Sequence, residues 1–288
     1  MSGFRPRFFV PPDAVSGPGA SGPSGGPSAG GTLTGSTVTL DAEDSHHVLK
    51  VLRLRAGDEC EVVVGTAVHA ATVLPGGAGA GGGAGAGAGG GKSVRLLLGD
   101  RLEGLDAGAA YRYTVALVQG LPRPSVVDLA IEKSTEVGVS LVLLVQTAGS
   151  PRPAGKDAAG RQARWYRIAR EAAKQSKQTV VPDVVAVASP AAALERVKAL
   201  GLVSVLLEPG AERSLHEVAR SLAGGASRED EVPGVALWIG PESGWTAAER
   251  QTLLEAGVAE ARLGQGVLRT ETAGPVAVAV ARLALGDW

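Results

Sequence analysis

Hydrophobic residues in the first third of the chain recur in short runs that alternate with polar residues. A period of two is typical of strands with one face in a core, and such runs lie at 38–40, 59–64, 66–73 and 93–98. One helix is predicted among them, from about Ser45 to Leu54. Short strands with so little helix predict a small β-rich domain over residues 1–102.

The pattern changes after Tyr111, where apolar runs alternate with helical segments. The predicted strands are 113–119, 141–145, 184–187, 203–207, 235–239 and 258–263. The predicted helices are 126–137, 161–177, 191–199, 215–222, 247–256 and one that begins at about residue 272. This alternation predicts an α/β domain with a largely parallel sheet over residues 110–288, after a linker near 103–110. In its first helix we expect core positions at Val126, Ile131 and Val137.

Two low-complexity tracts, at 14–31 and 75–91, are rich in glycine and cannot build a core. We interpret both as insertions in surface loops, since the cost of closing a loop grows slowly with its length. The second tract runs into Lys92 and Ser93, which invites comparison with a phosphate-binding loop. That motif requires glycine where Ala86 stands and a helix afterwards, whereas residues 93–99 alternate like a strand, so the motif is not predicted.

Composition excludes several classes of protein. The chain has 288 residues, 44% hydrophobic and 20% charged, which excludes wholesale disorder. Aromatic residues make up only 3%, which disfavours stacking as the main mode of ligand recognition. The single cysteine, Cys60, excludes an intramolecular disulfide, and the four histidines lack metal-site spacing, so no metal is expected. No apolar run reaches the ~20 residues of a membrane span and no signal-peptide core precedes Pro11, so we expect a cytoplasmic protein.

Charge is unevenly distributed although the net charge is only −1. Between Ser150 and Val180 there are eight basic residues and two acidic ones. A second basic group, Lys50, Arg53 and Arg55, follows His46 and His47, which we interpret as solvated histidines. Each basic group fits either a solvated helix face or a contact with RNA phosphates.

Three loops that leave predicted strands carry unusual residues, and ligands bind at such strand ends in α/β sheets. The segments are SVLLEPG at 204–210, VALWIGPESGWTAAER at 235–250 and ARLGQGVLRTETAGP at 261–275. Glycines there let the backbone approach a nucleoside, although ordinary turn chemistry is the alternative. The dinucleotide-binding fingerprint GxGxxG is only weakly supported. Gly264-Gln265-Gly266 supplies its first two glycines, but Arg269 occupies the position of the third.

Taken together, these loops resemble the ribosomal small subunit methyltransferase E family, the 16S rRNA uracil-N3 methyltransferases. GPESGWTAAE is similar to the family motif GPEGG(L/I)xxxE, and LGQGVLRTETA is similar to LGxxxLRxETA. Further matches are RFFV at 7–10, HHVLKVLRLRAGDE at 46–59, EKSTEVGV at 132–139 and EAAKQS at 171–176. The resemblance covers nearly the whole chain outside the glycine-rich tracts.

The resemblance implies a PUA-like RNA-binding small β-barrel domain followed by a SPOUT α/β domain whose C-terminal part forms a trefoil knot. It also implies S-adenosylmethionine as the methyl donor, 16S rRNA of the small ribosomal subunit as the substrate, and a homodimer with the cofactor pocket beside the subunit interface. The implied cofactor-binding residues are Leu207, Glu208, Gly210, Ile239, Gly240, Pro241, Glu242, Gly244, Leu263, Gly264, Val267, Leu268 and Thr272.

The chain departs from the family pattern at three places. Ser243 replaces a glycine and would be strained if that position requires a positive φ. Arg123-Pro124-Ser125-Val126 stands where the family has Lys-Gly-Asp/Glu-Arg. The family's QSxR becomes Gln175-Ser176-Lys177-Gln178. The last two departures fall where we expect RNA contacts.

Methylation of uracil N3 requires that the N3 proton leave, so a base or a cation that stabilises the uracil anion is expected. We assign Arg269 to the uracil and Glu271 to the proton or to holding Arg269, the alternative being an ion pair that only fixes the loop. Glu242 could act in catalysis or could be a carboxylate that interacts with the dipole at a helix N-terminus. The predicted RNA contacts are Arg5, Arg7, Lys50, Arg53, Arg55, Arg123, Arg164 and Arg167. A non-catalytic RNA-binding ribosome assembly factor and a dinucleotide-dependent oxidoreductase stay open as alternatives.

Overall fold

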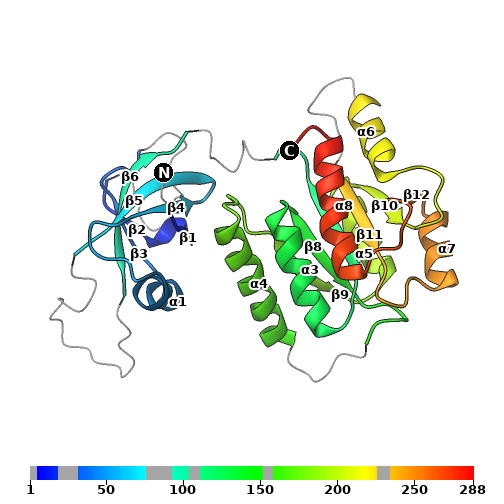
Figure 1. Ribbon diagram of the computed structural model, residues 1–288, viewed down its shortest axis with the longest axis horizontal. Coiled ribbons are helices and arrows are strands. Elements are labelled where there is room, and N and C mark those ends of the chain that lie inside the picture. The colour runs from blue at the N-terminus through cyan, green and yellow to red at the C-terminus, as the bar shows by residue number, and fades with distance from the viewer. Residues whose placement is uncertain (1–4, 19–31, 76–92, 104–110, 152–157, 226–233) are drawn as a thin grey trace. The chain divides into compact units, whose positions relative to one another are not determined.

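The protein forms two compact units, Met1–Ala109 and Ala110–Trp288, each described by itself (Figure 1). The computed structural model describes residues 5–18, 32–75, 93–103, 111–151, 158–225 and 234–288. Most of the two glycine-rich tracts and of the expected linker lies outside these residues. Within the described part of the chain, no helix is both long and apolar enough to cross a membrane.

The first unit contains a six-stranded sheet in the order β1-β4-β5-β6-β3-β2, antiparallel except for the pair β1–β4. Its strands are β1 (Arg7–Val10), β2 (Val15–Ser16), β3 (Thr37–Thr39), β4 (Glu59–Val64), β5 (Ala67–Val73) and β6 (Arg95–Arg101). The four predicted strands are present with small shifts at their ends. Two edge strands, β1 and β2, were not predicted, because such short strands show too little alternation to be recognised.

The helix predicted at 45–54 is present but starts and ends earlier. Helix α1 (Ala42–His46) continues directly into a π-helical segment, η2 (His47–Leu52), and a short 3-10 turn, η1 (Pro12–Ala14), precedes β2. Asp41 caps α1, because its Oδ1 accepts a 2.7 Å hydrogen bond from the backbone N–H of Asp44. Arg53 then ends the segment in the left-handed conformation, with φ of 55°.

The second unit is an α/β domain with an entirely parallel sheet in the order β12-β10-β11-β7-β8-β9. The strands are β7 (Val115–Gly120), β8 (Leu141–Val145), β9 (Asp183–Val187), β10 (Val203–Leu207), β11 (Val235–Ile239) and β12 (Ala259–Ala261). The helices are α3 (Pro124–Glu136), α4 (Ala158–Gln175), α5 (Pro190–Ala199), α6 (Leu215–Gly225), α7 (Ala247–Glu255) and α8 (Thr270–Ala284). The expected fold class, a small strand-rich domain followed by an α/β domain with a parallel sheet, is confirmed. The trefoil knot stays a prediction.

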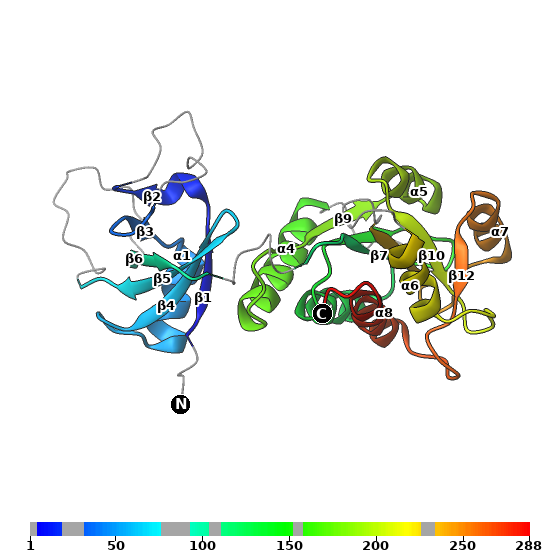
Figure 2. The same cartoon turned by 90° about the horizontal axis from the view of Figure 1, so that it is seen from above.

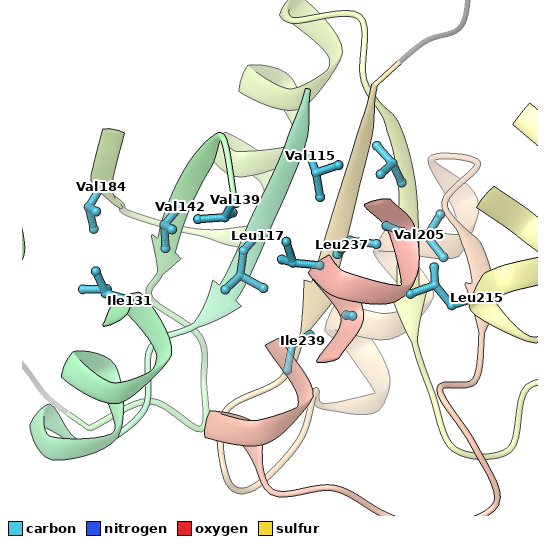
Figure 3. Packing of buried hydrophobic residues seen from close by; sticks show 14 of the residues in the cluster. Val115, Leu117, Ile131, Val139, Val142, Val184, Val205, Leu215, Leu237 and Ile239 are labelled. Carbon is cyan, nitrogen blue, oxygen red and sulfur yellow. The ribbon is translucent and has the colours of Figure 1, made fainter. Parts of the chain in front are cut away.

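Helices cover both faces of this sheet, with α3, α4, α6 and α8 on one face and α5 and α7 on the other (Figure 2). The strands are therefore buried on both sides, which explains why they are continuous apolar runs. Val115 and Leu117 of β7 contribute to the core under α3 and α8 (Figure 3). Ala116 and Val118 contribute to the core under α5 and α7. Alternate residues of one strand thus supply two cores.

The core positions of α3 differ from those expected at one of three places. Ile131 is fully buried, as predicted, and lies in the core of Figure 3. Val127 is buried in place of Val126, and Val137 is only partly buried, although it packs against the core. The helix begins at Pro124 rather than Val126, which sets the face that meets the sheet.

Strand β7 lies at the centre of the sheet, and the chain passes first to β8 and β9 on one side and then to β10 on the other. Such a reversal opens a space at the carboxyl ends of the strands, where ligands bind in sheets of this kind. The loops that follow β10, β11 and β12 leave the sheet at this edge. They are the three loops that the sequence singles out.

Candidate functional site

A cavity of about 630 Å³ lies at this edge of the sheet, wholly within the second unit. We call it the loop cavity. Three segments supply nearly all of its walls: 207–209 after β10, 239–245 after β11 and 263–273 between β12 and α8. Its lining residues are Arg123, Leu207, Glu208, Pro209, Ile239, Gly240, Pro241, Glu242, Gly244, Trp245, Leu263, Gly264, Gly266, Val267, Leu268, Arg269, Thr270, Glu271 and Ala273.

The loop after β11 is a tight turn that depends on two glycines. The backbone N–H of Gly244 donates a 2.8 Å hydrogen bond to the carbonyl of Pro241, and Gly244 has φ of +74°, which side chains rarely tolerate. A Cβ on Gly240 would lie 3.0 Å from the Cα of Gly244. Both glycines are therefore required for the turn to close beside the loop cavity.

Ser243 does not carry the strain that a positive φ at its position would have imposed. The positive φ in this turn belongs to Gly244, and Ser243 is not among the described residues with a positive φ. The Ser243 Oγ instead donates a long 3.5 Å hydrogen bond to the carbonyl of Gly149. A Cβ on Gly149 would clash with that Oγ, so the serine fits because residue 149 has no side chain.

Glu242 interacts with the start of α3 rather than with the helix that follows it in sequence. Its Oε1 accepts hydrogen bonds from the Nε of Arg123 at 2.9 Å and from the backbone N–H of Arg123 at 3.3 Å, and Arg123 is the N-cap residue of α3. Burial raises the pKa of Glu242, but hydrogen bonds from backbone N–H groups and from Arg123 outweigh it and lower the pKa. Glu242 is therefore an anion that joins two walls of the loop cavity.

Glu208 is a partly buried carboxylate of the loop cavity. Burial raises its pKa above the usual 4.5; the charge of Arg250 opposes this rise and the charge of Glu260 adds to it, both to a smaller extent. Among the described residues Glu208 forms no ion pair, since the nearby Arg250 pairs with Glu260 at 2.5 Å. The loop cavity thus contains a partly desolvated negative charge, which a cationic ligand would stabilise.

Arg269 and Glu271 stand at the start of α8 with different exposures. The Arg269 side chain is 86% exposed, whereas that of Glu271 is 19% exposed. Their closest charged atoms, Arg269 Nη1 and Glu271 Oε1, are 3.9 Å apart, which is too long for a strong hydrogen bond. The guanidinium is therefore loosely held at the cavity and accessible to a second molecule.

Eleven of the thirteen residues that the resemblance implied for cofactor binding line the loop cavity. The exceptions are Gly210 and Thr272, which are exposed outside the lining. The other eight lining residues were not assigned to the cofactor: Arg123, Pro209, Trp245, Gly266, Arg269, Thr270, Glu271 and Ala273. Most of them are neighbours of assigned residues, and Trp245 could have been found as the aromatic residue directly after a glycine turn.

The basic residues predicted to contact RNA separate into two groups. The prediction that Arg7 contacts RNA is wrong. Its side chain is 2% exposed, and its Nη2 lies 2.8 Å from the carboxylate of Glu61, its register partner on β4, so Arg7 stabilises the sheet. Arg5 pairs with Glu59 at 2.5 Å, and Arg164 pairs with Asp128. The remaining predicted residues, Lys50, Arg53, Arg55, Arg123 and Arg167, are exposed.

The fold and the loop cavity define a class of protein, an α/β enzyme scaffold with a glycine-lined, nucleoside-sized site at its topological switch point and a second, strand-rich domain. The family model described as "RNA methyltransferase domain" matches residues 110–282, more than half of the chain, and "RNA methyltransferase PUA domain" matches residues 40–71. The chain belongs to this RNA methyltransferase family.

Similar proteins of known sequence carry the name "Ribosomal RNA small subunit methyltransferase E". One from Mycobacterium tuberculosis is 33% identical over 183 residues, which are 62% of this chain and 66% of that protein. One from Bacillus subtilis is 27% identical over 240 residues, which are 82% of this chain and 85% of that protein. The chain thus spans about two thirds of the mycobacterial relative in that alignment.

A solved structure with the same fold is that of ribosomal RNA small subunit methyltransferase E from Neisseria gonorrhoeae bound to S-adenosyl methionine. It superposes with a TM-score of 0.72 at 23% identity and covers 97% of this chain and 98% of the other. At this identity the likeness shows a shared fold for both units.

Proposed function

We propose that this protein uses S-adenosylmethionine to methylate N3 of a uridine in 16S rRNA of the small ribosomal subunit. The observation that carries the proposal is the loop cavity, in which segments distant in sequence meet at the carboxyl ends of β10, β11 and β12. Family membership supports RNA methylation, and the names of the relatives support the ribosomal small subunit as the substrate. Action on ribosomal RNA would place the protein in the cytoplasm.

The residues of the loop cavity fit the proposed cofactor. Three carboxylates, Glu208, Glu242 and Glu271, line the cavity together with two cations, Arg123 and Arg269. This acidic balance suits a sulfonium cation and disfavours the diphosphate of a dinucleotide, because like charges repel at short range. When bound, the cofactor would supply an activated methyl group.

Glycine-rich segments provide the remaining recognition. The glycines of the lining, Gly240, Gly264 and Gly266, present backbone groups without a side chain at those positions, which suits the edge of a base. Leu207, Ile239 and Leu268 supply apolar surface around them. Holding both reactants in line is expected to contribute roughly 7–11 kcal/mol of the barrier reduction.

Arg269 and Glu271 are the residues that we assign to the reaction itself. The exposed guanidinium of Arg269 would stabilise negative charge on the uracil ring as the N3 proton leaves. Glu271, less exposed and 3.9 Å away, would hold Arg269 in place or accept the proton. Because N3 lies on the Watson–Crick edge, the uridine must be unpaired or flipped out when it reacts.

Calorimetric titration with S-adenosylmethionine tests the cofactor assignment. We expect saturable binding by the wild type and a loss of at least about tenfold in affinity for Gly240→Ala, since a Cβ there lies 3.0 Å from the Cα of Gly244. Gly99→Ala, on β6 in the first unit, is the comparison, because the nearest atom to a Cβ there would be 3.4 Å away, an ordinary contact distance. Wild-type protein that binds RNA but not S-adenosylmethionine would favour the assembly factor, and uptake of a dinucleotide would favour the oxidoreductase.

RNA binding is expected to depend on salt. If exposed cations contact phosphates, the log–log slope of affinity against salt should be about −0.7 per contact for a single strand. Arg167→Gln should therefore make the slope less negative by about 0.7, measured by fluorescence anisotropy with a labelled small-subunit RNA fragment. Arg196→Gln, an exposed cation on α5, is the control. A salt-independent affinity would remove the phosphate contacts from the proposal.

A homodimer is also part of the proposal. Val276 and Leu283 lie two helical turns apart on α8 and are 36% and 58% exposed, and Trp288 beyond the helix is 65% exposed. An apolar stripe of this kind is typical of a buried interface. Leu283→Glu is expected to convert the dimer into a monomer in light scattering, while Leu200→Glu, which starts from 51% exposure, should not. A wild type that is monomeric at micromolar concentration would contradict this assignment.

A further inference from the structure

Gln119 is a fully buried polar residue near the end of β7, directly behind the loop cavity but not part of its lining. Its Nε2 lies 2.9 Å from the Oγ1 of Thr270 and 3.1 Å from the carbonyl oxygen of Gly240. It also lies 3.1 Å from the carbonyl oxygen of Gly120. One carboxamide therefore reaches the loop after β11 and the first residue of α8 together.

The two protons of the Gln119 Nε2 can serve Gly240 and Thr270 together, and the directions of these two hydrogen bonds are consistent with each other. Thr270 donates its hydroxyl proton to the carbonyl of Gly240 at 2.6 Å, so its oxygen is available to accept from Gln119. The carbonyl of Gly240 accepts from both side chains. Gln119, Thr270 and Gly240 thus form a closed triangle, which we call the loop clamp.

A missing side chain on α8 allows the loop clamp to form. Gly274 lies one turn after Thr270, and a Cβ there would lie 3.1 Å from Leu117 Cδ2 and 3.6 Å from Gln119 Oε1. Because glycine stands there, α8 approaches β7 closely enough for Thr270 to reach Gln119.

Stability alone is a poor explanation for Gln119. Its Oε1 is buried and has no hydrogen-bond partner among the described residues. A buried carboxamide with one unsatisfied atom contributes little net stability compared with an apolar side chain of similar size. The neighbouring inward positions of β7 are apolar, including Val115 and Leu117. Gln119 is therefore a polar exception among these apolar positions, and it lies where two loops of the cavity meet.

We infer that Gln119 is a positioning residue that fixes the spacing between the two glycine-rich loops and so holds the loop cavity in its binding-competent form. The inference rests on the proposed function. Without the loop clamp the two loops would move independently, and only a fraction of the molecules would have the binding-competent cavity. The apparent dissociation constant for the cofactor would then equal the intrinsic constant divided by that fraction. The Gln119 side chain itself would not touch the cofactor.

Calorimetric titration with S-adenosylmethionine tests the inference in four variants of the full chain. We expect Gln119→Met and Thr270→Val each to weaken binding by about tenfold or more. The loss of affinity in the double variant should be smaller than the product of the two single losses, because both substitutions disrupt the same loop clamp. Thr135→Val is the control, since it deletes a buried hydroxyl that donates to the Ile131 carbonyl within α3, away from the cavity. The unfolding midpoint of each variant is measured in parallel.

A pH profile separates positioning from a purely structural role. In Gln119→Glu the ionised carboxylate cannot donate to Gly240 or Thr270, whereas the protonated form can donate one hydrogen bond. Its affinity relative to wild type should therefore improve as the pH is lowered, while that of Gln119→Met stays weak. Wild-type affinity in the Gln119 variants, or losses that follow the unfolding midpoint as in Thr135→Val, would overturn the inference. A wild type that does not bind S-adenosylmethionine would overturn the proposed function as well.

Discussion

Replacing Arg269 with alanine is expected to lower the rate of methyl transfer by about 10²–10³-fold, the usual effect of removing one group that stabilises a developing anion. The side chain is 86% exposed at the rim of the loop cavity, so its removal leaves no buried group unpaired in the free protein. Affinity for S-adenosylmethionine should change little. The loss would therefore fall on the chemical step.

The measurement is single-turnover transfer of labelled methyl from S-adenosylmethionine to small-subunit RNA, with the cofactor dissociation constant determined separately. Arg269→Lys keeps the charge without the planar fork and should give an intermediate rate. Glu271→Gln shows whether the carboxylate acts on the proton or only holds Arg269. An unchanged rate in Arg269→Ala would assign Arg269 and Glu271 to fixing the loop alone. Mapping the product to N3 of uridine tests the site of methylation.

Replacing Arg282 with methionine is expected to destabilise the second unit by about 3–5 kcal/mol, the usual cost of removing one partner of a buried ion pair. Arg282 is fully buried, and its Nη1 lies 2.6 Å from Asp287 Oδ2. Its guanidinium also donates to the carbonyls of Gly138 and Tyr113 and lies 3.9 Å from the ring of Tyr111. Burial lowers the pKa of Arg282, and Asp287 partly offsets that shift.

Among the described residues, the variant would leave the buried Asp287 carboxylate with only the backbone N–H groups of Arg112 and Tyr113 as donors. Denaturant unfolding followed by tryptophan fluorescence measures the effect. All four tryptophans lie in the second unit, so the signal reports on that unit alone. Arg196→Met, an exposed position on α5, is the control. A loss below about 1 kcal/mol would mean that the pair and its carbonyl contacts barely exceed their desolvation cost.

Much of the second unit could be predicted from the sequence because its signals are local. Strands β8, β10 and β11 have the predicted bounds, since strands buried on both faces are continuous apolar runs between polar turns. The walls of the loop cavity were also predicted, because the residues of each wall are contiguous. The turn at Gly240 and Gly244 depends on residues within one segment, so its motif can be recognised from the sequence.

The alternation of strands and helices, the glycine turns and the family resemblance can all be read from neighbouring residues of the chain. The tertiary structure decided the order of the strands, and with it the partners of polar side chains. Arg7 meets Glu61 across two strands that are 54 residues apart in sequence, so its burial could not be inferred locally. Gln119, Gly240 and Thr270 converge only because β7 and β11 are neighbours beneath α8. Local pattern specifies which segments are helix, strand or turn, whereas pairing and burial depend on which distant segments the fold brings together.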